Sequence, residues 1–173
     1  GLMNLTGPPI ALHSTDYLAE QLNTSRYTGA QNLRDLVAEN VMWSIEDDSE
    51  YSQEQYTAVS ERLLGVVFGV AAQIVEEDIC SMEDVDRGAK VGLRWARGPF
   101  EMMNRIGVAE AYRMAQSYRA IAGDAWALPS FFKEQADAST NWDFSYVDLF
   151  VEDGIATITI NRPEAMNALN EVV

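Results

Sequence analysis

The sequence predicts a mainly α-helical bundle that ends in a fragment of a β-hairpin. Apolar residues recur at helical spacing in several segments up to about residue 135. Glycine and proline, above all Gly98-Pro99, divide these segments from one another. Branched and aromatic residues then flank Glu152-Asp153-Gly154, which is the pattern of two strands joined by a tight turn.

The first two helices are predicted to be short. Ser14 is a candidate helix start, because Leu18 and Leu22 follow it one turn apart. Residues 31–39 form a second amphipathic segment. The acidic stretch 44–54 is interpreted as a solvated connection or as the N-terminus of the next helix, where the helix dipole favours carboxylates.

Residues 55–79 carry the strongest helical pattern. Apolar and small residues surround this segment on most sides, which is typical of a helix at the centre of its domain. Gly65 and Gly69 lie four residues apart and therefore on one face. Each interior glycine costs about 1 kcal/mol relative to alanine, so we expect another helix to approach closely there.

Shorter helices follow this segment. Ser81 resembles the first residue of a capping box, with a carboxylate three residues later, and predicts a helix through about Val91. Further helices are expected over 100–106, 108–121 and 129–135. Residues 136–145 are rich in Ala, Asp, Ser, Thr and Asn and are interpreted as a linker before the hairpin.

The net charge of −15 limits the partners of the 173-residue chain. Duplex nucleic acid and anionic membrane surfaces would be repelled, since both are bound through Lys and Arg. The basic residues are ten Arg but only Lys90 and Lys133. This balance favours a cytoplasm of very high salt, where charge repulsion is screened. An acidic protein of an ordinary cytoplasm is the alternative.

Several classes of site are not predicted. No stretch approaches the length of a membrane-spanning helix, and the first residues do not resemble a signal peptide. Cys80 is the single cysteine and is interpreted as a buried structural residue rather than a reactive thiol or metal ligand. His13 is the single histidine, and a structural role is favoured over catalysis. The acidic clusters lack the spacing of a calcium loop, so no metal site is expected.

An internal repeat relates two distant segments. "LMNLTGPPIALHST" from Leu2 and "MMNRIGVAEAYRMA" from Met102 align at a constant offset. The coinciding pairs are Met3 and Met103, Asn4 and Asn104, Gly7 and Gly107, and Ala11 and Ala111. Both segments predict a short helix that ends at a glycine, followed by a longer helix.

The stretch "CSMEDVDRGAKVGLRWARGPFEMMNRIGV" resembles the C-terminal helical domain of 3-hydroxyacyl-CoA dehydrogenases. The resemblance rests on Glu83-Asp84-Val85-Asp86, Gly92, Gly98-Pro99-Phe100-Glu101 and Gly107. It implies four parts of the chain: residues 1–43 as the tail of a first helical repeat, 44–135 as a second, 136–145 as a linker, and 146–173 as the truncated start of another domain.

The last segment, "GIATITINRPEAMNALN", resembles the opening of the crotonase (enoyl-CoA hydratase/isomerase) family, with Asn161-Arg162-Pro163 and Asn167-Ala168-Leu169 as the signature. The two resemblances together imply a piece of a longer, fused β-oxidation enzyme, similar to archaeal and bacterial fusions. Such a parent would hydrate a 2-enoyl-CoA and oxidise the 3-hydroxyacyl-CoA with NAD. The parent would be cytoplasmic, with acyl-CoA as its substrate.

The resemblance assigns few functional residues to this segment. No Gly-x-Gly-x-x-Gly turn is present, so NAD would bind elsewhere in the parent. Glu61 stands where the family has a substrate-facing Asn, which implies a non-catalytic copy. Ala165, Met166 and Ala168 are candidate CoA contacts by resemblance only. We expect self-association as a dimer or larger, and we expect residues 146–160 to be poorly ordered or to pair with another chain, since a lone hairpin is marginal in water.

Overall fold

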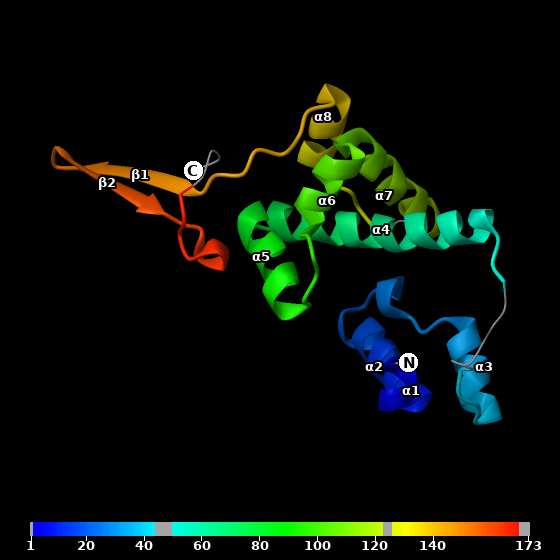
Figure 1. Cartoon of the computed structure of the whole chain (residues 1–173). Helices are drawn as coiled ribbons and strands as arrows, with labels where there is room; N and C mark the ends of the chain where they lie inside the picture. Colours follow the sequence, from blue (N-terminus) through cyan, green and yellow to red (C-terminus); the bar gives the residue numbers. More distant parts are fainter. Residues whose placement is uncertain (1, 44–49, 123–125, 170–173) are drawn as a thin grey trace. The chain divides into compact units, whose positions relative to one another are not determined.

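The computed structural model describes residues 2–43, 50–122 and 126–169, and the described chain is mainly helical, as predicted (Figure 1). The helices are α1 (Leu2–Thr6), α2 (Pro8–Gln21), α3 (Gln31–Glu39), α4 (Gln53–Glu76), α5 (Met82–Gly92), α6 (Pro99–Ile106), α7 (Val108–Ala122) and α8 (Ser130–Ala138), with 3₁₀ turns η1 (Ser25–Tyr27) and η3 (Pro163–Ala165). Strands β1 (Val147–Glu152) and β2 (Ile155–Ile160) follow α8.

The chain forms two compact units. Unit 1 comprises Gly1–Val59 and Arg119–Ala127, and unit 2 comprises Ser60–Tyr118 and Leu128–Val173. Most of the predicted acidic connection, residues 44–49, lies outside the described residues. The predicted domain boundaries at residues 43, 135 and 145 stay a prediction.

Unit 1 is built around α2 and α3. The helix predicted to start at Ser14 starts earlier, at Pro8, because a proline suits the first helical turn, where the missing N–H would have no partner in any case. The Asp16 carboxylate accepts the Gly29 N–H at 3.0 Å and pairs with Arg34 of α3. These bonds hold the pKa of Asp16 below its usual value, the backbone bond being the larger cause. They tie α2 to the connection that leads into α3.

The long helix α4 is the central element predicted from residues 55–79. Ser52 and Gln55 cap its start reciprocally: the Ser52 Oγ accepts the Gln55 N–H at 3.2 Å, and the Gln55 Oε1 accepts the Ser52 N–H at 2.8 Å. The close helix approach expected at Gly65 is confirmed. A Cβ there would lie 2.5 Å from the carbonyl oxygen of Met114 on α7. Glycine is thus required by helix–helix contact.

Helix α4 also corrects one expectation. An 18-residue window of this 24-residue helix has a mean hydropathy of 1.6, so by length and composition alone it could cross a membrane. The high hydropathy arises because small and apolar residues surround the helix on most sides. One such helix is weak evidence, since core helices of soluble proteins share the property. Phe68, Ala71 and Ala72 of α4 are buried in the core of unit 2, while 28% of the apolar window as a whole is buried.

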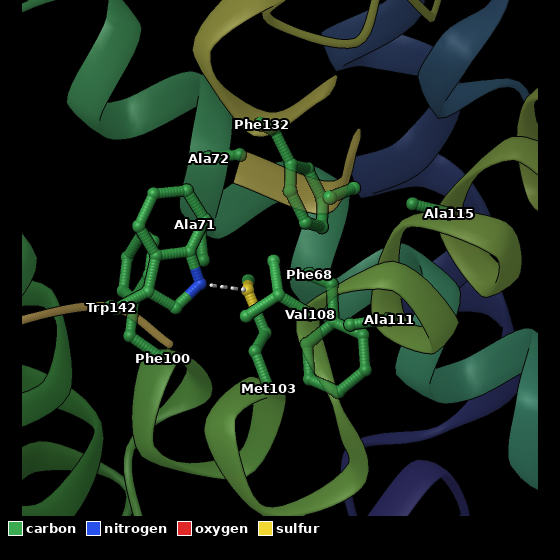
Figure 2. Close-up of a cluster of buried hydrophobic side chains, with 11 residues drawn as sticks. Phe68, Ala71, Ala72, Phe100, Met103, Val108, Ala111, Ala115, Phe132 and Trp142 are labelled. Atoms are coloured by element: carbon green, nitrogen blue, oxygen red, sulfur yellow. Dashed lines mark hydrogen bonds between the residues drawn. The ribbon is translucent and has the colours of Figure 1, made fainter. Parts of the chain in front are cut away.

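The core of unit 2 gathers side chains from α4, α6, α7 and α8 (Figure 2). Its fully buried large residues include Phe68, Phe100, Met103 and Phe132. Trp142 lies outside any helix or strand, yet its side chain is only 7% exposed. Its indole N–H points to the Met103 sulfur at 3.3 Å, and its ring meets Phe100 edge-on at 5.4 Å. The segment after α8 is therefore anchored in the core.

The internal repeat is visible in the backbone. Gly7 ends α1 with φ 91° and ψ 130°, and Gly107 ends α6 with φ 94° and ψ 128°. In unit 1 the Asn4 amide bonds both backbone groups of Trp43: it donates to the carbonyl at 2.6 Å and accepts the N–H at 3.2 Å. In unit 2 the Asn104 amide bonds Trp142 in the same way, at 2.9 and 2.7 Å.

The same order of elements surrounds both asparagines. α1, α2 and α3 precede Trp43 as α6, α7 and α8 precede Trp142. α3 and α8 both end at a residue in the left-handed conformation, Asn40 and Ser139. The two segments thus share a local fold. That residues 1–43 are the tail of a first copy of the domain stays a prediction.

The hairpin has the predicted turn and strand positions. β1 and β2 pair antiparallel with Leu149 opposite Ile158. One face is entirely apolar and is formed by Val147, Leu149, Val151, Ala156, Ile158 and Ile160. Nearly all of these side chains are exposed. The pairing of this hairpin with another chain stays a prediction.

We expect Asn104→Ala to lower the free energy of unfolding by about 1–3 kcal/mol, because the buried Trp142 backbone loses a donor and an acceptor at once. Thermal unfolding followed by near-UV circular dichroism, which reports tryptophan packing, measures this change. The exposed Asn141 provides a matched control. An Asn104→Ala protein that unfolds at the same temperature as Asn141→Ala would contradict this role.

Candidate functional site

The junction of α5 and α6 is organised by Asp86, the one buried charged residue among the described residues, at 2% exposure. Its Oδ1 accepts the Phe100 N–H at 2.8 Å, and its Oδ2 accepts the Glu101 N–H at 2.9 Å. These N–H groups belong to the first turn of α6, and the N–H groups of a first turn have no acceptor within their own helix. Asp86 therefore caps α6 from a neighbouring helix.

Gly98 makes this long-range cap possible. As the residue before α6 it has no side chain with which to cap the helix. A Cβ at this position would lie 2.1 Å from the Asp86 Cγ and 2.5 Å from its Cα. The backbone of Gly98 is in an extended conformation that any residue adopts, so space, and not backbone conformation, requires glycine here.

Glu101 completes the junction. Its Oε2 accepts the Gly98 N–H at 3.2 Å, and its Oε1 pairs with the Lys90 Nζ of α5 at 2.7 Å. Burial raises the pKa of Asp86 above the ordinary carboxyl value, although the two backbone N–H groups act in the opposite direction. Asp86, Gly98 and Glu101 belong to the sequence motifs on which the family resemblance rests, and they thus have a structural function.

Two apolar cavities share Trp95 as a lining residue. The first, of about 410 Å³, is lined by Leu64, Phe68, Trp95, Ala96, Arg97, Met102, Arg105 and Ile106. The second, of about 450 Å³, is lined mainly by apolar residues of α4 and α5, with Cys80, Asp84 and Trp95. Both volumes fall within the range of ligand pockets. Every lining residue belongs to unit 2.

Glu61, which the sequence resemblance places at the family's Asn position, takes part in an ion-pair cluster. Its Oε1 lies 2.9 Å from the Arg113 Nη2, which also lies 2.6 Å from the Glu110 Oε1. The hydrogen bonds that Arg113 donates to Glu110 and then to Glu61 raise the pKa of Arg113, and the bond from Arg113 lowers the pKa of Glu110. The groups are partly exposed, so the cluster adds little stability. Glu61 is thus engaged with α7.

The candidate CoA contacts Ala165, Met166 and Ala168 lie in and after η3. The Met166 side chain is 92% exposed. The N–H groups of all three residues already donate to carbonyl oxygens of this same turn, at 3.0–3.1 Å. A CoA molecule would therefore meet their carbonyl oxygens and side chains, unless the turn opens. Their assignment stays a prediction.

Other predicted residues have structural surroundings. Cys80 is half-buried, not buried as predicted. Partial desolvation first, and then the charge of Asp84, raise the pKa of Cys80, which makes the reactive thiolate scarcer. His13 is exposed, and its ring lies 6.2 Å from that of Tyr17. Within the described ranges, no three His, Cys, Asp or Glu residues gather to hold a metal ion.

The described residues do not fit a dinucleotide. Binding of a nicotinamide dinucleotide needs a parallel strand that leads through a glycine-rich turn into a helix. The only sheet in the described part of the chain is the antiparallel pair β1 and β2. No step that uses NAD is therefore assigned to this chain.

Sequence reasoning missed three of the residues that organise unit 2. The acidic motif of residues 83–86 does not by itself indicate the role of Asp86, although an acidic residue ahead of a Gly-Pro helix start is a usable signal for a cap. The repeat indicates Asn104 only as a recurring position. Trp142 was placed in a linker, because its burial depends on contacts with α6 and α8.

We expect Asp86→Ala to lower the free energy of unfolding by about 2–4 kcal/mol, because two buried N–H groups lose a charged acceptor. Chemical denaturation followed by far-UV circular dichroism measures this change. Asp137 on α8, an exposed partner of Lys133, is the control. The cap has no energetic importance if Asp86→Ala and Asp137→Ala unfold at the same denaturant concentration.

A second substitution tests the space at the junction. Gly98→Ala should cost about 2–4 kcal/mol, since the added methyl group meets the backbone of Asp86 and cannot be relieved by a rotamer change. Gly88→Ala, at an open position inside α5, should instead stabilise the protein by about 0.5–1 kcal/mol. Equal stabilities of the two variants would show that the junction is looser than described here.

One family model matches the chain. The model of the 3-hydroxyacyl-CoA dehydrogenase C-terminal domain matches residues 59–141. No curated protein and no solved structure matches the chain. The matched residues run from α4 to Asn141, next to Trp142, and so include the Asp86 junction and both cavities. Residues 59–141, which include most of the helices of unit 2, are therefore similar to the C-terminal domain of 3-hydroxyacyl-CoA dehydrogenases.

Proposed function

We propose that this chain is the non-catalytic central part of a bifunctional fatty-acid β-oxidation enzyme. The parent would hydrate a 2-enoyl-CoA and oxidise the 3-hydroxyacyl-CoA with NAD. The segment would pack the helical domains together and help to close the substrate cleft. The observation that carries the dehydrogenase part is the family match over residues 59–141.

The surroundings of Glu61 support the non-catalytic role. The family's position for a neutral, substrate-facing amide holds a carboxylate, and this carboxylate is paired with Arg113. The only histidine, His13, has no carboxylate bonded to it among the described residues, so a His–Glu base pair is not formed there. Dehydrogenation by this copy of the domain would need both the substrate-facing amide and the His–Glu base pair.

The hydratase part rests on the resemblance of residues 146–173 to the start of a crotonase domain. The observed hairpin, followed by η3 and by Asn167 and Ala168, is compatible with that resemblance. The exposed apolar face of the hairpin also suits a strand pair that other strands or helices would cover. A cytoplasmic parent that takes NAD and a CoA thioester is part of the same proposal.

A pure assembly module is the second candidate. It is favoured by the apolar cavity of about 450 Å³ against α4 and α5 and by the exposed side chains of Tyr56, Val59 and Leu63 along α4. Apolar surfaces of this kind are typical of protein interfaces. In this case the chain would form a homodimer or a larger assembly and would not touch the substrate.

Calorimetric titration with acetoacetyl-CoA in molar potassium chloride separates the two candidates. We expect binding in the micromolar range if the helical copy lines the cleft, and no heat if it is an assembly module. In either case we expect no oxidation of NADH with acetoacetyl-CoA and no hydration of crotonyl-CoA. Turnover above the background rate would contradict the non-catalytic assignment.

The variant Glu61→Asn adds a matched arm to this titration. It restores the family's amide, while Arg113 keeps Glu110 as a partner. If this position faces the ligand, the variant should bind acetoacetyl-CoA more tightly than the unmodified chain. Glu110→Gln, which removes the other carboxylate of the cluster, is the control and should leave the affinity unchanged.

A further inference from the structure

The cavity between α4, α6 and the loop that joins α5 to α6 combines apolar walls with two cationic groups. Leu64, Phe68 and Met102 supply aliphatic and aromatic surface, while Arg97 and Arg105 also line the space. Its volume of about 410 Å³ suits a small organic molecule. This arrangement is independent of the acyl-CoA function proposed above.

The two arginines lack acidic partners among the described residues. Six ion pairs are found in that part of the chain, and none of them includes Arg97 or Arg105. Both residues are exposed at the cavity. The chain has 27 acidic and 12 basic residues, so most arginines could find a carboxylate nearby. Two guanidinium groups at one apolar cavity therefore indicate an external anion.

The repeat supports this interpretation. Arg105 of α6 corresponds to Leu5 of α1, at the offset that relates Asn104 to Asn4. The local fold that Asn104 and Gly107 define is thus formed with a leucine at the matching position of unit 1. The helix–glycine–helix arrangement that the two segments share therefore does not require a positive charge at position 105. It is a property of the cavity in unit 2.

We propose that this cavity binds an anionic amphiphile, namely a carboxylate on a medium-length aliphatic chain. The tail occupies the space between Leu64, Phe68 and Trp95, and the carboxylate meets Arg97 and Arg105. Burial of the tail supplies most of the binding energy. Charge-assisted bonds to the guanidinium groups select an acidic head over a neutral one.

Titration calorimetry of the whole chain with octanoate tests this proposal, at the lowest salt concentration at which the chain is folded. We expect one octanoate per chain. Acetate has the head without the tail, and octan-1-ol has the tail without the charge, so both should bind at least tenfold more weakly. Octan-1-ol that binds as tightly as octanoate would overturn the proposal, because the arginines would then contribute nothing.

Three variants locate the site. Arg97→Leu with Arg105→Leu should weaken octanoate binding at least tenfold and leave octan-1-ol binding unchanged. Ala96→Trp should fill the cavity and weaken octanoate binding with both arginines retained. Arg119→Leu removes an exposed charge outside the cavity and should have no effect. Circular dichroism and thermal unfolding verify that each variant is folded.

The outcomes are separable from those for the proposed function. If the double arginine variant and Ala96→Trp both bind octanoate as the unmodified chain does, the ligand lies elsewhere and the proposal fails. If Arg119→Leu weakens binding as much as the double variant, the effect is one of overall charge, and the proposal also fails. Failure of acetoacetyl-CoA to bind affects neither result, since the octanoate titration contains no CoA.

Discussion

Unit 2 depends on the carboxylate of Asp86 more than on any other single group. Gly98 has no side chain with which to cap the first N–H groups of α6. The carboxylate satisfies the N–H groups of Phe100 and Glu101 and thereby fixes α6 against α5. Since Phe100 and Met103 of α6 belong to the core, the position of the core depends on this polar contact.

A second constraint acts at the other end of α6. Gly107, with its positive φ, turns the chain into α7, and Asn104 holds the backbone of Trp142 against the same helix. Gly7, Asn4 and Trp43 form the same arrangement in unit 1. A glycine turn with an asparagine bonded to a tryptophan backbone therefore does not depend on the core side chains of unit 2. Backbone-directed bonds of this kind tolerate large changes in the residues around them.

The sequence predicted the helices and the hairpin well because their patterns are local. Residues 31–39, 81–91 and 146–160 carry caps, periodicity or a turn that act within a few residues. The local pattern at Ser14 predicted the start of α2 six residues late, whereas the internal repeat predicted a longer helix directly after Gly7, as observed. The burial of Trp142 and the pairing of Glu61 with Arg113 join residues dozens of positions apart, and no local pattern reports such contacts.

The candidate site was less predictable than the fold for the same reason. The family motif identified Gly98 and Asp86 but did not explain them. In the structure, a Cβ at Gly98 would lie 2.1 Å from the Asp86 Cγ, so the cap by Asp86 requires glycine at position 98. Cavities form where side chains from separate helices fail to fill space, so Arg97 and Arg105 had no predictable relation to Leu64 and Phe68.

The contacts that hold unit 2 together and the groups that could bind a ligand are separate sets of residues. Asp86, Gly98, Asn104 and Trp142 make buried contacts. Glu61, Arg97 and Arg105 lie at the surface, where substitutions have small effects on stability. Substitutions at these surface positions can therefore change which ligand the domain binds, while the buried contacts keep the fold.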